Sequence, residues 1–481
     1  MRITNKIIQN NSLNNINTNK QLEDTLSTML SSNKKIARPS DDPIIALRSL
    51  RLRTSVNQVT QYVEKNVEDA KSWLTVTESA IGTLSEIITD VRKQYVKGTS
   101  DTLKPEDRTI ITDNLEALAA EIYNTGNADF AGRNVFAGYR TDTTITFQKQ
   151  EDIDYTITET FDDVTVDTVQ YVNQGATEND TFATDFVRIR LSYDKIDSID
   201  WTESSFDLPN FSGTLSMRTV SSSDSPDPYQ VALSDPSPAD GVAVFIPETG
   251  EIIFSKDVAN SVEDVADCSV VYNRSKWVKG ELRPEHYFNC KDNTNNKEYK
   301  SHGGEIQYNI GVNQSLRINT TADECFRHDI IRDLQDVIEA IKDVNDAEER
   351  ITKLKSKLDE LDVNDTTGRA AVQEEIDAAE KALTFINDKM HKLFSKSITK
   401  ADNYLDKNNI ALTDCGTRSK RLELIENRLD TQLGSLKELK SENEDADLAE
   451  TAIQMKSAEY SYNASLMATS KILQETLLNY I

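Results

Sequence analysis

Residues 67–95, VEDAKSWLTVTESAIGTLSEIITDVRKQY, decide how this chain folds. Apolar side chains recur there at alternating intervals of three and four residues, the heptad pattern of helices that pack along their length as coiled coils. Upstream, Asp42 and Pro43 form a strong helix start, because a capping carboxylate precedes a proline at the first helical position. The helix should continue to Gly98, a natural residue just past a helix end, and would be roughly 80 Å long. Its seam consists of Val67, Ala70, Leu74, Thr77, Ile81, Leu84, Ile88, Val91 and Tyr95.

Both ends of the chain carry amphipathic helical segments that should form an assembly interface. The first, residues 3–35, has seven asparagines between positions 5 and 19 and is weak as an isolated helix. Residues 1–38 carry a charge of about +4 and residues 441–481 about −5. We therefore expect the two helices to pair, with separate fraying tails as the alternative. The predicted interface residues are Ile3, Ile7, Leu13, Ile16, Leu22, Leu26, Leu448, Met455, Tyr462, Leu466, Leu473 and Tyr480.

The middle of the chain changes from a helical period to a period of two. Alternating apolar pairs such as Tyr155/Ile157, Val164/Val166 and Val187/Ile189 indicate half-buried strands. Val242, Val244 and Ile246 alternate in the same way, Glu248–Glu251 resembles a hairpin turn, and the proline-rich residues 221–240 indicate a loop or an irregular edge. Residues 146–324 hold 32 acidic and 14 basic side chains. This charge favours a solvated outer surface, and an acidic calcium site is the alternative.

Helical periodicity returns from about residue 329 to the end of the chain, where no proline occurs. Pro105 likewise opens a helix before the strands. The fold class predicted is mainly α with an inserted all-β domain, in which an elongated coiled-coil rod of N- and C-terminal helices carries the β domain at its outer end. The predicted divisions are 1–42 (assembly helix and linker), 43–145 (helical rod), 146–325 (outer β domain), 326–440 (returning rod with an extra helical hairpin at about 346–394) and 441–481 (assembly helix).

Composition excludes several classes of function. The formal charge of −27 argues against nucleic acid and anionic membrane surfaces as partners. The longest apolar run has five residues, far short of a membrane span, and the first residues lack the features of a cleaved secretory signal. The four cysteines and four histidines have no metal-ligand or redox spacing, and nucleotide-binding and nucleophile motifs are absent. No enzyme activity, cofactor or metal is therefore predicted.

Residues 30–43, LSSNKKIARPSDDP, and residues 136–143, FAGYRTDT, carry motifs that resemble those of the bacterial flagellin superfamily, and within it the proteins that join the hook to the filament. Residues 30–43, LSSNKKIARPSDDP, are similar to the junction family's LSSGKRI-x-RPSDDP, with Asn33 in place of glycine. Residues 136–143, FAGYRTDT, resemble its FAGxxTDT. Segments near 318–326, 416–429, 445–450 and 462–466 resemble the returning helices of the superfamily. The predicted motif residues are Arg38, Pro39, Asp41, Asp42, Pro43, Phe136, Ala137, Gly138, Thr141, Asp142 and Thr143.

The resemblance implies a structural adaptor between hook-associated proteins and the flagellin filament. It implies self-assembly into a ring or short helical layer, an export chaperone at the C-terminal helix, and export to the extracellular flagellum without a cleaved signal. It also implies terminal helices that order on assembly. The alternatives are flagellin itself, whose first motif lacks the prolines found at 39 and 43, and a secreted adhesin whose β domain binds a glycan or calcium.

Overall fold

The computed structural model describes residues 5–100, 103–161, 167–206, 214–233, 240–255, 258, 268–300, 304–362 and 364–478. The chain divides into two compact units, which are described separately. Unit 1 comprises Met1–Asp69, Asn309–Leu316 and Arg421–Ile481, and unit 2 comprises Ala70–Tyr308 and Arg317–Lys420. The domain boundaries drawn from the sequence, and the outer position of the β region, stay predictions.

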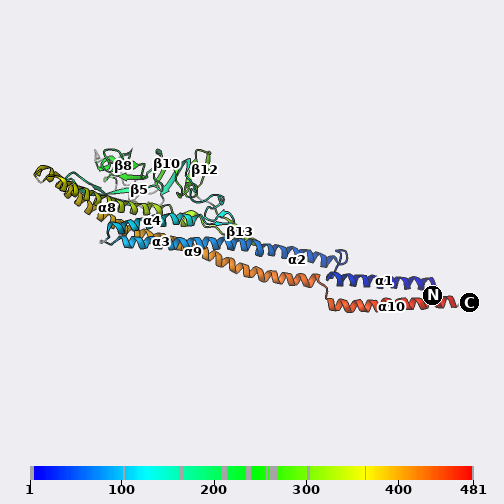
Figure 1. Cartoon of the computed structure of the whole chain (residues 1–481). Coiled ribbons are helices and arrows are strands. Elements are labelled where there is room, and N and C mark those ends of the chain that lie inside the picture. The colour runs from blue at the N-terminus through cyan, green and yellow to red at the C-terminus, as the bar shows by residue number, and fades with distance from the viewer. Residues whose placement is uncertain are drawn as a thin grey trace. The chain divides into compact units, whose positions relative to one another are not determined.

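Unit 1 holds both ends of the chain. Helices α1 and α10 lie side by side (Figure 1) and run antiparallel, because Asn19 contacts Ser465 while Lys34 pairs with Asp445. The predicted pairing of the chain ends is confirmed. The unit contains α1 (Asn5–Ser32), α2 (Pro43–Gln61), the π-helix η1 (Tyr62–Val67) and α10 (Leu448–Leu478). It also contains the last part of α9 (Thr366–Glu444) and most of the two-stranded ribbon of β13 (Gln307–Gly311) and β14 (Gln314–Arg317).

Helix α2 begins as the sequence predicts. The Asp42 carboxylate accepts the backbone N–H groups of Ile44 and Ile45 at 2.9 and 3.1 Å, and Pro43 occupies the first turn. The chain is helical from Pro43 to Gly98, as predicted, but the π-helix η1 lies between the α-helical parts α2 and α3. The buried and half-buried positions 59, 63 and 67 are separated by two successive intervals of four residues. A regular heptad alternates intervals of three and four, so this stretch has one residue more. The wider π turn absorbs the extra residue and keeps the apolar seam on one face.

Unit 2 contains α3 (Glu68–Gly98) from Ala70 onward, α4 (Pro105–Gly126), the short α7 (Ala322–Cys325), α8 (Asp329–Glu360) and α9 up to Lys420. Helix α3 packs antiparallel to α9. The amide of Asn408 donates to the carbonyl of Ile81 at 3.0 Å, and Arg92 pairs with Asp402 at 2.6 Å. Gly98 is the last residue of α3 and not the residue after it, and a Cβ there would overlap the ring of Phe394.

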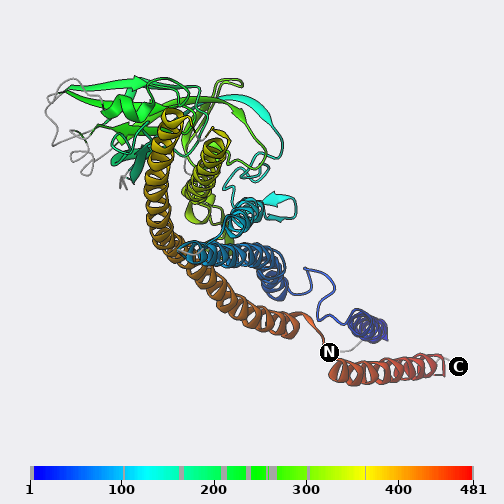
Figure 2. The ribbon, with the colours of Figure 1, turned by 60° about the vertical axis from the view of Figure 1, so that its left-hand side comes forward.

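Helices α8 and α9 form the hairpin that the sequence predicts around residues 346–394, in which α8 ends at Glu360 and α9 begins at Thr366. Ion pairs between Lys389 and Asp343, and between Lys355 and Glu380, join the two helices. Figure 2 shows the hairpin beside the strands of the same unit. The hairpin contacts the β region through side chains such as Arg350, which donates to Gln174, and Lys381, which donates to the carbonyl of Glu178.

The β region has two five-stranded sheets, in the orders β12-β11-β3-β10-β6 and β4-β5-β9-β8-β7, and a small ribbon of β1 and β2. All the pairs are antiparallel except β7 with β8. The strands are β1 (Asp129–Phe130), β2 (Arg133–Asn134), β3 (Glu151–Phe161), β4 (Asp167–Asn173), β5 (Phe182–Arg190), β6 (Ser198–Ser205), β7 (Thr214–Thr219), β8 (Asp240–Ile246), β9 (Glu251–Phe254), β10 (Cys268–Trp277), β11 (Asn289–Asp292) and β12 (Lys297–Tyr299).

Several predictions for this region need correction. It is not all-β, because the short helix α5 (Pro228–Leu233) lies in the segment expected to be a loop, and a 3-10 turn spans Pro284–His286. Helix α5 packs on the second sheet through Ala232. The helix can form because proline is tolerated in the first turn of a helix, and the next prolines follow only after its end. The hairpin turn before Glu251 is confirmed by the pairing of Ile246 with Glu251. The expected strand residues Val164 and Val166 lie outside the described residues.

All four cysteines are buried free thiols. Burial raises the pKa of Cys268 and Cys290 to about 12, so these thiols stay protonated at neutral pH. In the described part of the chain, no helix offers a stretch long and apolar enough to span a membrane.

Candidate assembly site at the chain ends

A short backbone bridge joins the two linkers of the terminal helices in unit 1. Lys34, just after α1, pairs with Asp445, just after α9, in an isolated antiparallel bridge. The backbone N–H of Lys35 donates to the carbonyl of Glu444 at 2.8 Å, and the Lys35 ammonium donates to the carbonyl of Glu442. The entry into α2 and the exit from α9 are thus tied together.

Glu444 is the buried centre of this joint, with 2% of its surface exposed. Arg53 of α2 binds it through two hydrogen bonds, from Nε at 2.6 Å and from Nη2 at 2.9 Å. The hydroxyl of Ser49 and the ammonium of Lys34 also donate to it. The hydrogen bond from Arg53 lowers the pKa of Glu444 to about 2, and those from Ser49 and Lys34 act in the same direction against burial. The carboxylate is therefore ionised at neutral pH.

The motif of residues 38–43 shapes the linker between α1 and α2. Asp41 accepts backbone N–H groups from Ala37 at 3.2 Å and Arg38 at 2.8 Å, which closes a tight turn, and Asp42 and Pro43 begin α2. The side chains of Arg38 and Pro39 are exposed. Asn33, which replaces the glycine of the resembling motif, adopts a φ of 55°, a left-handed conformation that asparagine tolerates better than most residues.

The second motif, residues 136–143, lies in unit 2 and fastens the helices of that unit to its β region. Phe136 is buried and packs edge-on against Phe326, with ring centroids 4.8 Å apart. Gly138 has a φ of 60°, which allows the chain to turn without strain. Arg140 then donates to the carbonyl of Glu285 and stacks on a tyrosine ring. Ala137 is buried, Thr141 and Thr143 are half-buried, and Asp142 is exposed. These residues position elements and hold no reacting group.

The contact between α1 and α10 is unusually polar for a helix pair. Its buried and half-buried positions alternate by four and three residues on both helices, as in a heptad seam. Asn19 donates to the hydroxyl of Ser465 at 2.8 Å across the seam. The positions are Ser12, Ile16, Asn19, Glu23, Leu26 and Leu30 on α1, and Thr451, Met455, Ala458, Tyr462, Ser465 and Thr469 on α10. A seam with this many polar residues buries little apolar surface, so the intrachain pair is weakly held.

The predicted interface residues fall into two groups. Ile16, Leu26, Met455 and Tyr462 lie in the intrachain seam. The second group remains exposed to between 41% (Leu466) and 54% (Leu13) of the residue surface. Its other members are Ile7, Leu22 and Leu448. Ile3 and Tyr480 lie outside the described residues, and Leu473 belongs to α10. The role of these residues in subunit contacts stays a prediction.

An outer column of apolar side chains on α10 was missed by the sequence reasoning. Ile453, Tyr460 and Met467 recur every seven residues and are 71%, 73% and 71% exposed. Tyr460 follows the seam residue Ala458 by two positions, a rotation of about 200° around the helix. The outer column therefore faces away from α1. The strict interval of seven was visible in the sequence, but a single seam was predicted for this helix, which left these three residues out.

A serine, a histidine and an aspartate also meet in unit 2, at the start of α8. Ser192 Oγ lies 2.7 Å from His328 Nδ1, and the same nitrogen lies 2.9 Å from Asp329. A catalytic triad uses the two different nitrogens of its histidine, and its serine is not held by a second carboxylate. Here the hydroxyl donates to buried Glu159 at 2.7 Å. Burial lowers the pKa of His328, but Asp329 and Glu159 outweigh it and raise that pKa. The cluster is an internal clamp between the sheet and α8.

Comparisons with known proteins show where the chain is similar to flagellar proteins. Residues 3–141 match the bacterial flagellin N-terminal helical region. The chain is 29% identical over 144 residues to flagellar hook-associated protein 3 of Salmonella typhimurium, which is 30% of this chain and 45% of that protein. It is 30% identical over 115 residues to the protein of the same name from Escherichia coli K12, 24% of this chain and 36% of that one. The aligned part spans less than half the length of these relatives.

Flagellins and solved structures give similar matches. The flagellin of Clostridium tyrobutyricum is 29% identical over 127 residues, 26% of this chain and 33% of that protein. The crystal structure of flagellar hook associated protein-3 from Legionella pneumophila covers 81% of this chain and 98% of its own, with 11% identity and a TM-score of 0.30.

Proposed function

The chain belongs to the bacterial flagellin superfamily through its N-terminal helical region, and we propose that it is a structural subunit at the junction between hook-associated proteins and the flagellin filament. In this proposal the protein works by packing against its neighbours and carries out no chemical step. Its place is outside the cell, in the flagellum.

The outer column of α10 is the observation that carries the proposal. An exposed apolar side chain is ordinary by itself, but three in line on one helix face form a stripe that water solvates poorly. Subunits related by a repeated rotation bury such surfaces in one another and form rings or helical layers. We therefore assign the outer column to contacts with a second copy and with the neighbouring hook-associated protein and flagellin.

The weak intrachain seam supports a further part of the proposal. A pair of helices held by few apolar contacts can separate at low cost, so the C-terminal helix is available to an export chaperone before assembly. Assembly then supplies the apolar burial that the isolated chain lacks. The bridge at Lys34 and Asp445 keeps the two linkers in register while the helices beyond it exchange partners.

Flagellin is the second candidate, because two of the matching relatives carry that name. Deleting the gene separates the candidates. A junction subunit predicts cells with bare hooks that release unpolymerised flagellin into the medium, and a flagellin predicts that no flagellin is released. Normal filaments in the deletion strain would contradict both. For the adhesin alternative, the described residues contain no group of three His, Cys, Asp or Glu side chains placed to hold a metal ion.

A further inference from the structure

The start of helix α8 is joined to the first sheet of unit 2 by a chain of hydrogen bonds. Glu159 of β3 is 2% exposed and accepts the hydroxyl of Tyr272 at 3.0 Å and that of Ser192 at 2.7 Å. The Ser192 oxygen lies 2.7 Å from Nδ1 of His328, and the same nitrogen lies 2.9 Å from Asp329. These contacts tie β3, β10 and the segment after β5 to the first residues of α8.

The hydrogen-bonding pattern determines which groups donate. An ionised carboxylate can only accept, so Nδ1 of His328 carries a hydrogen that is shared between Asp329 and Ser192. Ser192 in turn gives its one hydroxyl hydrogen to Glu159, whose other oxygen accepts the backbone N–H of Ser192 at 3.2 Å. The chain therefore ends in a buried carboxylate, which is costly unless a positive charge is near.

His328 is the group that supplies this positive charge. Over the residues that the structure describes, no arginine or lysine forms an ion pair with Glu159, and Arg327 pairs with Asp329 at 2.8 Å. The other charged groups near the joint are Arg274, which pairs with Glu281 and Asp194, Arg332, which lies 4.0 Å from Asp194, and Lys407 of α9. Burial raises the pKa of the nearby thiol and phenols, which therefore stay neutral: Cys268, Tyr123, Tyr193, Tyr272 and Tyr287.

The joint can exchange a proton with water. The His328 side chain is 22% exposed and borders a cavity of about 50 Å³, which has room for a water molecule. Burial lowers the pKa of His328, but Asp329 and Glu159 outweigh it and raise that pKa above its ordinary value of 6.5. Burial also raises the pKa of Glu159 against the hydrogen bonds that it accepts. The pair therefore holds one proton more tightly than the same two groups do in the unfolded chain.

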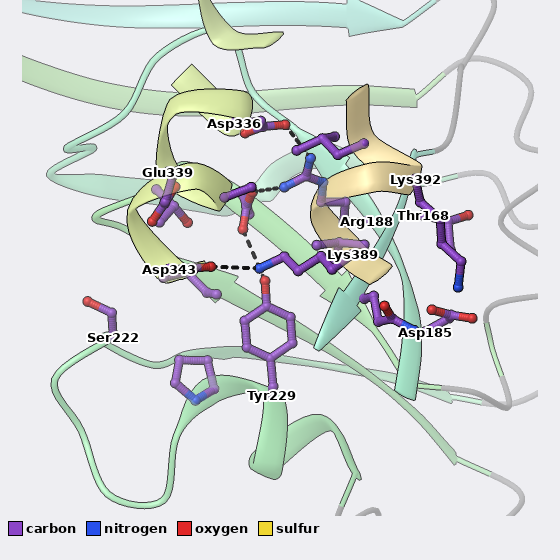
Figure 3. A pocket seen from close by; sticks show the side chains of 18 of the residues that line it. Thr168, Asp185, Arg188, Ser222, Tyr229, Asp336, Glu339, Asp343, Lys389 and Lys392 are labelled. Atoms are coloured by element: carbon purple, nitrogen blue, oxygen red, sulfur yellow. Dashed lines mark hydrogen bonds and ion pairs between the residues drawn. The ribbon is translucent and has the colours of Figure 1, made fainter. Parts of the chain in front are cut away.

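A second attachment of α8 does not titrate in the same range. About two turns further along the helix, Asp336 pairs with Arg188 of β5 at 2.6 Å (Figure 3) and also with Arg190. Burial would raise the pKa of Asp336, but the two arginines outweigh it and lower that pKa. Arginine keeps its charge at high pH, so these pairs stay ionised from mildly acidic to alkaline solution.

We propose that Glu159, Ser192 and His328 form a pH-sensitive latch that loosens the start of α8 from the first sheet as the solution becomes alkaline. Loss of the shared proton to water leaves Glu159 buried without a positive neighbour, and Asp329 then adds a second negative charge at the other end of the chain of hydrogen bonds. The arginine pairs of β5 still hold α8 to the second sheet. The latch is separate from the chain ends, so its failure would leave the proposed flagellar role untouched.

Urea unfolding followed by tryptophan fluorescence tests the latch, because Trp73, Trp201 and Trp277 all lie in unit 2. A raised pKa in the folded chain contributes stability that is complete below pH 6.5 and is lost as the pH rises. Between pH 6.5 and 9 the unfolding equilibrium constant should therefore rise by up to tenfold per pH unit. A constant that does not change over this interval in the native chain overturns the proposal.

Three variants assign the rise to the joint. His328→Gln keeps a hydrogen-bond donor but has no titrating proton, so it should remove the rise, and Glu159→Gln should reduce it. His286→Gln is the matched control, because His286 is a buried histidine of the same unit whose pKa burial lowers to about 4. It is neutral throughout the interval, so the control should keep the native slope.

Circular dichroism shows which variants fold, and Glu159→Gln decides the outcome where His328→Gln does not. Equal slopes in the native chain and in the folded variants of the joint would show that other groups cause the pH dependence. Loss of the slope in His286→Gln would contradict the assignment in the same way.

Discussion

Glu444 is a single carboxylate on which several segments of unit 1 depend. It accepts hydrogen bonds from two side chains of α2, Ser49 and Arg53, and from Lys34 in the linker after α1. Its backbone carbonyl also receives the N–H of Lys35. A charged acceptor with several donors is strong, but removing it leaves buried donors without a partner.

Replacing Glu444 by glutamine should therefore destabilise unit 1 by about 2 kcal/mol. The amide keeps the shape but cannot neutralise Arg53 and Lys34. Urea unfolding followed by helical circular dichroism measures the loss. Glu442→Gln is the control, because the Glu442 side chain is exposed and only its backbone carbonyl takes part in the joint. Equal stability of the two variants would show that Glu444 does not hold the joint.

The same residue predicts a pH dependence. The folded chain holds the pKa of Glu444 at about 2, below its ordinary value of 4.5. A lowered carboxyl pKa contributes stability that is complete above the ordinary value and is lost as the pH falls toward the folded value. The stability difference between the native chain and Glu444→Gln should thus shrink between about pH 4.5 and pH 2. A difference that stays constant over that interval would contradict the assignment.

At this scale the sequence revealed the motifs but not their contacts. An aspartate followed by a proline is a local signal for the start of a helix, so the role of Asp42 and Pro43 was predicted correctly. Glu444 lies in the run Ser441–Asp445, which has the composition of an exposed break, and its burial depends on residues almost 400 positions away. No local pattern reports such a partner.

Among the elements, α3 shows how a glycine can serve packing. Gly98→Ala should destabilise unit 2 by about 2 kcal/mol, because the new methyl group overlaps the ring of Phe394. Gly82→Ala in the same helix is the matched opposite. Open space surrounds its Cβ position, so the change should stabilise the helix by about 1 kcal/mol. Thermal unfolding of the two variants compares them, and a shift in the same direction for both would refute this reading of Gly98.

For α10, the proposal predicts that Tyr460→Asp blocks assembly and leaves the chain folded. A carboxylate in the centre of the outer column cannot be buried against another subunit without a large desolvation cost. Motility and filament counts in a complemented deletion strain measure the effect, which should be at least tenfold. Ser461→Asp adds the same charge beside the column on the flank away from Leu466 and should be tolerated. Wild-type motility with Tyr460→Asp would contradict the assignment of the outer column to the subunit interface.

The spacing of apolar residues predicted the helices and strands well, but it predicted less well which face of each helix is buried. The helical hairpin, the pairing of the chain ends and most strands follow from the spacing of apolar residues. The seam between α1 and α10 does not, because many of its positions are Ser, Asn, Thr or Glu, while the larger apolar residues Leu13, Leu22 and Tyr460 point elsewhere. The π-helix η1 and the short α5 were missed for related reasons. One extra residue in a heptad and six residues between prolines carry little signal in a single sequence.

For the molecule as a whole, charge and family point in one direction. The net charge of −27 lies mostly in residues 146–324, which keeps that region solvated, and among the described residues eight of the twenty exposed large apolar side chains lie on α1 and α10. This division suits a subunit that meets its neighbours through the chain ends. The resemblance at residues 30–43 and 136–143 could be read from the sequence, and the match over residues 3–141 bears out the family. The position of the protein in the flagellum is still a proposal.

Immunogold electron microscopy tests that position most directly. Antibodies raised against the β region, residues 151–299, would be applied to flagella with hooks attached. The proposed junction role predicts label in one narrow zone between hook and filament, absent from the deletion strain. Label along the whole length of the filament, or none on the flagellum, would contradict it.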